Sequence, residues 1–303
     1  MLGNCWFLAA ASAIAEKPQR MEKVFLNNTA GLNKAGIYGV NLWSLGVPHT
    51  VIVDDYMPHF EWNGETMSPF SKIARDNGMW IQILEKAFAK YHGNYSHIDA
   101  GNPPTAVRII NGSPSTKTYL SRTSADKLWQ MIMKHDAAGD IMTAGTYGND
   151  DSHKDANGLM QGHAFTLLGA VQLDDGTKLV KIRNPHGVDY YKGPWSDNDP
   201  RWSNPSVAKQ AGYRKNLNDG ITFMDLATFM QGFKFMDVGI DVSKWHHNYM
   251  MEHDANQWYP GTSKYCGKTC AKQQVKFTSD VAQTIYITAH TWHKRNAPAS
   301  CNW

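Results

Sequence analysis

The sequence predicts an α+β fold of two domains, the first mainly helical and the second β-rich. Helical apolar patterns at 5–15 and 80–91 precede a segment rich in glycine and proline at 99–104, and strand patterns follow it. The length of 303 residues suits about two domains that each bury a core. We therefore expect one domain at 1–100, a second at 101–242 and a further unit at 243–303.

Composition and charge exclude several classes of protein. Hydrophobic residues make up 42% of the chain and charged residues 19%, as in ordinary globular proteins. The net charge of +3 comes without a basic cluster, so we expect no nucleic-acid partner. No apolar run approaches the ~20 residues of a membrane span, and no signal-peptide pattern opens the chain. Four cysteines in so long a chain favour a reducing compartment, so we expect a cytoplasmic protein.

The expected elements of the first domain are helices around one strand hairpin. Pro18 ends the first helix, because proline cannot continue a helix interior. Apolar residues recur at helical spacing from Trp80 to Tyr91, so one face of that helix lies in a core. The expected ranges are helices at 5–15, 19–26 and 80–91 and strands at 37–43 and 50–53, joined by a turn at 45–48.

The expected elements of the second domain are mostly strands. One amphipathic helix precedes them, with Ser124 as its N-cap. A polar loop at 148–158 precedes His163, and polarity alone does not distinguish a cleft-flanking loop from a solvated connection. The expected ranges are helices at 124–135 and 225–231 and strands at 141–146, 166–171, 178–184, 220–224, 235–242, 274–277 and 282–289.

Cys5 stands where a loop meets an alanine-rich helix. The first N–H groups of a helix lack partners and the macrodipole is positive there, so this position stabilises a thiolate. A cysteine considered alone is more often a small buried hydrophobic residue. The residues that follow in the chain decide between these two interpretations.

A histidine and an asparagine occupy the ends of two neighbouring strand patterns. His163 precedes one apolar run, and Asn184 follows another, 21 positions later. A cysteine near the start, then a histidine and then an asparagine is the chain order of papain-like thiol proteases. An isolated histidine at a strand end is more often a satisfied core residue, so the prediction rests on the three together.

Several motifs in register resemble the calpain family of cysteine proteases, from residue 2 to about 242. The motifs, in family order, are Leu2-Gly3-Asn4-Cys5-Trp6-Phe7-Leu8-Ala9-Ala10, Val51-Ile52-Val53-Asp54-Asp55-Tyr56-Met57-Pro58, Leu84-Glu85-Lys86-Ala87-Phe88-Ala89-Lys90, Gly162-His163-Ala164, Arg183-Asn184-Pro185 and Gly193-Pro194-Trp195-Ser196-Asp197.

This resemblance implies a papain-like protease core that acts as a cytoplasmic endopeptidase on protein or peptide substrates through an acyl-thioester. Cys5 would be the nucleophile, His163 the general base and acid, and Asn184 the residue that orients the histidine. The unit at 243–303 resembles the beginning of the β-sandwich domain that follows a calpain core. The sequence identifies no regulatory partner.

The chain departs from the family pattern at three positions. The glutamine that calpains carry six residues before the nucleophile falls before Met1 of this sequence. His186 stands where a tryptophan usually shields the asparagine–histidine bond, and Asn4 replaces an aspartate. These departures leave a second interpretation open, a non-catalytic scaffold of calpain type that binds peptide without cleaving it.

Metal binding remains a secondary expectation, since the thiol chemistry requires no cofactor. In the family, a calcium site lies in the region from Asp189 to Asp219; Asp197 and Asp219 match acidic positions, whereas Tyr190 and Ile221 stand where glutamates are expected. Calcium takes six to eight oxygen ligands, so two acids provide only part of a site. In the tail, Cys266 and Cys270 with nearby histidines form a looser zinc-type pattern.

Overall fold

The computed structural model describes residues 2–26, 33–73, 77–215, 219–243, 245–247, 258–260, 269–271 and 278–288. Internal contacts divide the chain into two units, and the second comprises residues 246–289. In that second unit, strands β11 (Trp258–Pro260) and β12 (Thr269–Ala271) pair antiparallel. The strand predicted at 282–289 is wrong over 282–288, which form no strand. The strand predicted at 274–277 lies outside the described residues.

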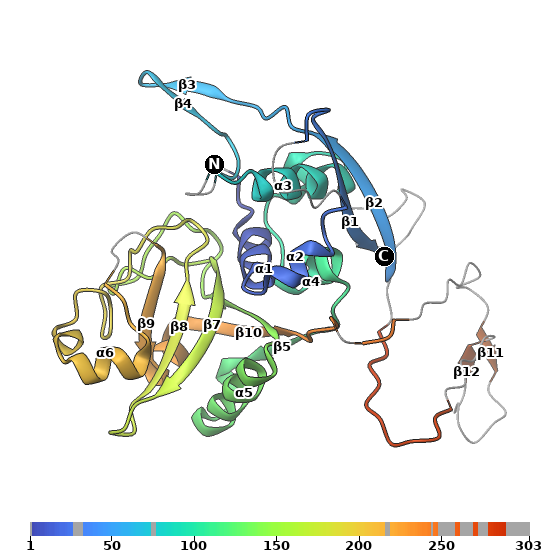
Figure 1. Cartoon of the computed structure of the whole chain (residues 1–303). Helices are drawn as coiled ribbons and strands as arrows, with labels where there is room; N and C mark the ends of the chain where they lie inside the picture. Colours follow the sequence, from blue (N-terminus) through green and yellow to red (C-terminus); the bar gives the residue numbers. More distant parts are fainter. Residues whose placement is uncertain are drawn as a thin grey trace. The chain divides into compact units, whose positions relative to one another are not determined.

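The first part of the larger unit contains four helices and two hairpins (Figure 1). The helices predicted at 5–15 and 80–91 are confirmed at both ends, whereas the one predicted at 19–26 is shorter. The elements are α1 (Cys5–Ala15), α2 (Pro18–Glu22), β1 (Ile37–Ser44), β2 (Val47–Asp54), β3 (Phe60–Trp62), β4 (Glu65–Met67), α3 (Trp80–Tyr91), the 3-10 turn Tyr95–Ile98 and α4 (Pro103–Asn111).

The first hairpin has a tighter turn than the sequence suggested. Leu45 and Gly46 both have positive φ, at 51° and 81°, and make a two-residue turn between β1 and β2. Pro48 therefore belongs to β2, opposite Trp43, rather than to the turn. A proline is tolerated there because β2 is an edge strand of a two-stranded sheet.

The second part of the same unit is a six-stranded sheet in the order β5-β10-β6-β7-β8-β9, in which every neighbouring pair is antiparallel (Figure 1). The prediction of an α+β fold is thus confirmed. The strands are β5 (Ser115–Tyr119), β6 (Ile141–Thr146), β7 (Ala164–Gln172), β8 (Lys178–Arg183), β9 (Ile221–Asp225) and β10 (Phe233–Gly239); the helices are α5 (Ala125–Ala138), α6 (Pro205–Ala211) and α7 (Leu226–Gly232), and 3-10 turns lie at Leu120–Arg122 and Pro200–Ser203.

Two helices of this part begin at side-chain caps that the sequence contains. The Ser124 hydroxyl accepts a hydrogen bond from the Lys127 N–H, and the Asp225 carboxylate accepts one from the Thr228 N–H. Each cap satisfies one of the backbone donors that have no partner in the first turn. No helix among the described residues is long and apolar enough to cross a membrane.

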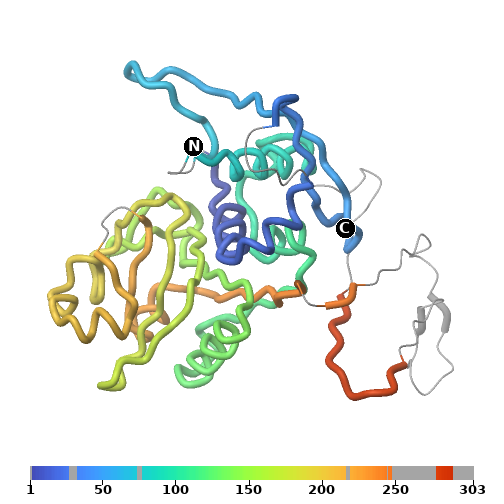
Figure 2. Tube along the Cα trace, viewed as in Figure 1, coloured from blue at the N-terminus to red at the C-terminus, as the bar shows by residue number. Residues whose placement is uncertain are grey.

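The buried apolar residues form two main clusters, and the first one joins the helical part to Ile141 of β6 and Ala164 of β7. The first cluster gathers α1, α3 and the β1–β2 hairpin, and α4 joins it through Ala106, Val107 and Ile110. The second cluster lies between the sheet and helices α5 and α7. β10 runs from the sheet to α4, as the chain trace makes clear (Figure 2). The domain bounds expected at residues 100 and 242 stay a prediction.

A buried arginine on α2 ties the helical part to the end of β10. Arg20 is 2% exposed, and its guanidinium donates to Gly139 O and to the Asp241 carboxylate, at 3.0 Å in the second case. Burial alone would raise the pKa of Asp241, but the hydrogen bonds from Arg20 and from the Ser243 N–H outweigh it and lower this pKa to about 2.

We expect Asp241→Asn to lower the free energy of unfolding by about 2–3 kcal/mol at neutral pH, because a buried charged hydrogen bond is lost. A carboxyl whose pKa is lower in the folded state stabilises the fold above its unfolded pKa, and this contribution is lost as pH falls toward 2. Urea unfolding of both proteins between pH 7 and pH 3 measures the difference. Asp54→Asn, which breaks an exposed pair with Lys86, is the control and should cost much less than Asp241→Asn, because exposed ion pairs are screened by solvent. An equal cost in both variants would contradict this account.

Candidate active site

The register of β7 and β8 brings His163 and Asn184 together. The two strands are antiparallel, and Thr166 pairs with Arg183. The beginning of β7 and the end of β8 therefore lie side by side at the same end of the sheet. The residue before β7 thus meets the residue after β8. The predicted proximity of His163 and Asn184 follows from this pairing.

The Asn184 side chain fixes the orientation of the His163 ring. Its Oδ1 lies 2.9 Å from His163 Nε2 and also accepts from the His186 N–H at 3.1 Å, while its Nδ2 donates to Val188 O at 2.9 Å. Because these backbone partners decide which end of the amide is the oxygen, His163 Nε2 carries a proton and donates it. Both side chains are buried, with exposures of 2% and 5%.

Helix α1 brings Cys5 close to the same histidine, whose Nε2 is already hydrogen-bonded to Asn184. The Thr166 hydroxyl on β7 donates to Ala9 O at 2.8 Å, and Arg183 donates to the Ser12 hydroxyl at 3.0 Å. Four buried positions of α1 are alanines, and their small side chains allow the helix to pack closely on the sheet. Cys5 is a partly exposed free thiol, and its Sγ lies within 4.8 Å of a His163 ring nitrogen.

A buried carboxylate holds the loop that precedes Cys5. Glu85 on α3 is 1% exposed; it accepts from the Asn4 amide and from both the N–H and the hydroxyl of Ser71, at 2.9 and 2.6 Å. Burial raises the pKa of Glu85, and the hydrogen bonds from Ser71 and Asn4 partly oppose that rise. Glu85 on α3 thus holds this loop in place, and the Asn4 side-chain amide has a hydrogen-bond partner there.

The sequence did not single out Asp151, which lies beside the same histidine. Its Oδ2 is 3.5 Å from His163 Nδ1 and 3.9 Å from His186 Nε2. The only signal in the sequence was an acid twelve positions before His163 in the polar loop at 148–158. Spacing in a loop without periodicity does not predict a contact, so only the structure reveals it.

The charges around His163 favour its protonated form. Burial opposes the imidazolium, but the Asp151 carboxylate and then Cys5 outweigh burial, with a further contribution from Asn184, and raise the pKa of His163 to about 9. The pKa of the Asp151 carboxyl is lowered, chiefly by its contact with His163. The arrangement therefore stabilises a positive histidine between a thiol and a carboxylate.

The sequence comparisons agree with this geometry. Residues 1–239 match the sequence model of the calpain family cysteine proteases. The chain belongs to this family. It is 31% identical over 240 residues to the calpain-type cysteine protease DEK1 of Zea mays, and 31% and 28% identical over 243 and 244 residues to human calpain-12 and the human calpain-1 catalytic subunit. These alignments cover 77–78% of this chain, but 11% of the maize protein and 33–34% of the human calpains.

The two acids expected to bind calcium lie in one hollow of the sheet part. Asp197 and Asp219 line a cavity of about 360 Å³, together with the Tyr213 ring and the Lys181 and Arg214 side chains. Burial, and then the charges of Asp189 and Asp219, raise the pKa of Asp197 to about 7. One Asp197 carboxylate oxygen is buried without a hydrogen-bond partner.

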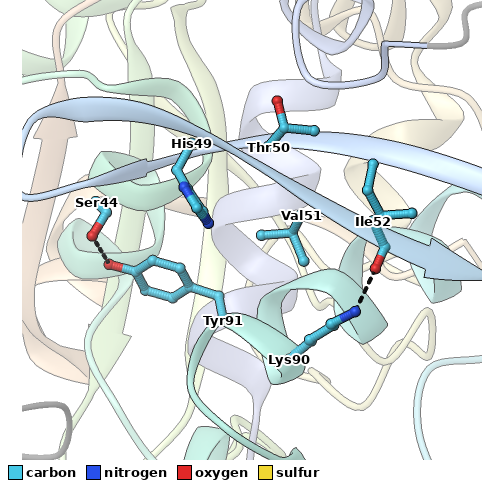
Figure 3. A pocket seen from close by; sticks show the side chains of 7 residues that line it. All are labelled: Ser44, His49, Thr50, Val51, Ile52, Lys90 and Tyr91. Carbon is cyan, nitrogen blue, oxygen red and sulfur yellow. Dashed lines mark hydrogen bonds between the residues drawn. The ribbon is translucent and has the colours of Figure 1, made fainter.

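A larger pocket, of about 470 Å³, lies on the β1–β2 hairpin and α3 (Figure 3). Two of its polar side chains already have partners, since Lys90 donates to Ile52 O at 2.8 Å and the Tyr91 hydroxyl donates to Ser44 at 3.3 Å. None of the predicted catalytic residues lines it. The zinc-type pattern that the sequence suggests at Cys266 and Cys270 lies outside the part of the chain whose side chains the structure describes.

Proposed function

We propose that this chain is the catalytic core of a cysteine endopeptidase in which Cys5, His163 and Asn184 form the triad. One observation carries the proposal: the two nitrogens of a single buried imidazole face a free thiol on one side and an amide oxygen on the other. An asparagine orients the ring without adding a charge, so the positive histidine pairs with the thiolate.

In the proposed reaction, the Cys5 proton moves to His163 Nδ1, and the thiolate sulfur bonds to the carbonyl carbon of the scissile peptide. The carbonyl electron pair becomes an oxyanion. When the carbon–nitrogen bond breaks, His163 Nδ1 gives its proton to the leaving amine, and an acyl-thioester remains on Cys5. Water then attacks this ester with His163 as the base, which releases the acid and restores the thiol.

The first turn of α1 supplies a donor for the oxyanion. The Cys5 N–H belongs to the helix terminus, where backbone donors have no partner within the helix. A donor that is fixed before the reaction stabilises developing charge at little reorganisation cost, and removal of such a donor typically costs ~10²–10³ in turnover. The same helix end thus serves both the thiolate and the oxyanion.

The proposed substrates are proteins or peptides, and the proposed compartment is the cytoplasm, where a free thiol stays reduced. Because the chain spans 11–34% of the length of the three relatives named above, the activity of a longer protein is part of this proposal. The rival function, a scaffold that binds peptide without cleaving it, predicts peptide binding without covalent labelling of Cys5.

A thiol-directed peptidyl electrophile tests the nucleophile, and peptide hydrolysis tests the orienting residue. We expect labelling of the wild-type chain and none of Cys5→Ala. Asn184→Ala should fold, as measured by circular dichroism, and lose about 10–100-fold in kcat/KM, because the His163 ring is no longer held. Unchanged turnover would remove Asn184 from the triad, and a folded chain with unlabelled Cys5 would favour the scaffold.

His186 should limit activity only in acid. Its ring centroid lies 4.7 Å from that of His163, and burial, followed by the charge on His163, lowers the pKa of His186 to about 4. It is therefore neutral near pH 7, and below about pH 5 its protonation places a like charge beside the imidazolium. We expect His186→Trp to keep its activity at pH 7 and to extend the acid limb of kcat/KM.

A pH profile of peptide hydrolysis from pH 4 to pH 9 measures this effect. His153→Trp, at an exposed histidine of the 148–158 loop, is the matched control and should leave the acid limb in place. Superimposable profiles of wild type and His186→Trp would show that the His186 charge does not reach the triad.

We also propose that calcium binds at Asp189, Asp197 and Asp219. The buried Asp197 oxygen without a hydrogen-bond partner, beside two further carboxylates, supports a site for a hard cation. Among the described residues, the carboxylates of this cluster do not form a set of three ligand atoms within 4.8 Å, so binding requires them to move closer. The triad chemistry involves no metal, and calcium would act by fixing the segment that follows Asn184.

Calcium at a hundred times its Kd should raise the free energy of unfolding by about 2.7 kcal/mol, and Asp197→Asn should remove this increase. Without calcium, Asp197→Asn should be at least as stable as wild type above pH 7, because ionisation of a carboxyl with a raised folded pKa costs stability there. Thermal unfolding with calcium or a chelator measures both effects. Asp175→Asn, in the exposed β7–β8 turn, should keep the calcium effect; a calcium response that Asp197→Asn retains would refute the site.

A further inference from the structure

Three ligand-type atoms of different chemistry converge at the start of α1. Cys5 Sγ, a His163 ring nitrogen and an Asp151 carboxylate oxygen all lie within 4.8 Å of one another. His163 Nδ1 and Asp151 Oδ2 are 3.5 Å apart, which is too long for a good hydrogen bond. Two ligands at about 2.0–2.1 Å from one tetrahedral zinc ion stand about 3.3 Å apart. The spacing therefore suits two ligands of one ion.

The neutral form of the histidine can bind a metal through Nδ1. Its Nε2–H donates to Asn184 Oδ1 at 2.9 Å, so the neutral ring carries its lone pair on Nδ1. His163 is 2% exposed, and Nδ1 is buried without a hydrogen-bond partner. An oxygen that holds the far nitrogen of a ligating histidine is the usual outer-shell arrangement of zinc sites.

The other two ligands are accessible and of the right type. The Cys5 thiol is free and partly exposed, and the Asp151 side chain is 36% exposed at the end of a loop. Thiolate, imidazole and carboxylate are all zinc ligands, whereas calcium takes oxygen ligands only. Three protein ligands with a fourth position for water make an open zinc site.

We propose that Cys5, His163 and Asp151 form a Zn²⁺ site that blocks the nucleophile. Binding joins the metal to Cys5 Sγ, His163 Nδ1 and one Asp151 oxygen, and the one proton that the thiol and His163 Nδ1 hold between them is released to solvent. The occupied sulfur then has no electron pair for a substrate carbonyl. Metal binding is independent of any protease activity, and only its inhibitory consequence rests on the proposed function.

Co²⁺ titration of the chelator-treated full chain tests binding without reference to activity, because cobalt bound to a thiolate gives a charge-transfer absorption band. Subtraction of the Cys5→Ala spectrum isolates this site from any contributed by the cysteines of the tail. We expect a band in the difference spectrum that stoichiometric Zn²⁺ removes. The absence of such a band at saturating Co²⁺ would overturn the proposal.

Asp151→Asn tests the third ligand. It should weaken Co²⁺ binding at least tenfold, because even loss of a residue that only supports a metal ligand typically lowers metal affinity by about that factor. Asp150→Asn is the matched control, since that neighbouring carboxylate binds Ser152 and His153 instead, and it should bind Co²⁺ like wild type. Asp151→His supplies a neutral ligand and should restore binding. Equal affinities of wild type and Asp151→Asn would refute the three-ligand site.

Two further measurements separate this inference from the proposed function. Zn²⁺ should protect Cys5 from alkylation in wild type and Asp150→Asn at concentrations that do not protect Asp151→Asn. Zn²⁺ should also inhibit peptide hydrolysis by wild type at least tenfold more strongly than hydrolysis by Asp151→Asn. Binding and protection in a chain that cleaves no peptide would uphold the metal site and refute the protease. Inhibition that is equal in both proteins would refute the metal site alone.

Discussion

The contact between helix α1 and strand β7 is the constraint on which the rest of the site depends. Cys5 begins a helix and His163 directly precedes a strand of the sheet, so their distance is set by how closely α1 packs on the sheet, where Ala164 shares the apolar cluster of α1. Buried alanines on α1 permit that approach, and the hydrogen bond from Thr166 to Ala9 O fixes the helix along its axis. A larger side chain at an alanine position would widen the gap directly beneath the nucleophile.

The two ends of α1 are held by different parts of the chain, so the position of Cys5 depends on both of them. Glu85 on α3 holds the loop before Cys5 through Asn4, whereas Arg183 on β8 contacts the later part of the helix at Ser12. Since Arg183 directly precedes Asn184, the strand that positions this asparagine also fixes the helix that carries Cys5. The geometry of the proposed triad is therefore coupled to β8 at two points.

Much of this arrangement could be predicted from the sequence because it rests on periodic elements. Helix α1 and strands β7 and β8 have clear apolar patterns, and antiparallel pairing then brings His163 to Asn184. Helix α4 escaped prediction because Pro103 and Pro104 were interpreted as a boundary, although proline also suits the first turn of a helix. Strand β5 consists of polar residues without apolar alternation, and Asp151 lies in a loop whose path no local rule specifies.

The charges at the site explain why it would attract a cation. When Cys5 is a thiolate, His163 contributes one positive charge against two negative charges, since His186 is neutral near pH 7 and Asn184 carries no charge. Asp151 thus stabilises the imidazolium, yet it leaves the cluster net negative just where an oxyanion must form. The positive end of α1 compensates only in part, because a helix terminus corresponds to about half a charge. A divalent ion offsets this excess more completely than a proton does, and it does so by occupying the atoms that catalysis requires. In the proposed metal site, the same carboxylate that stabilises the charged histidine therefore makes the proposed nucleophile open to metal inhibition.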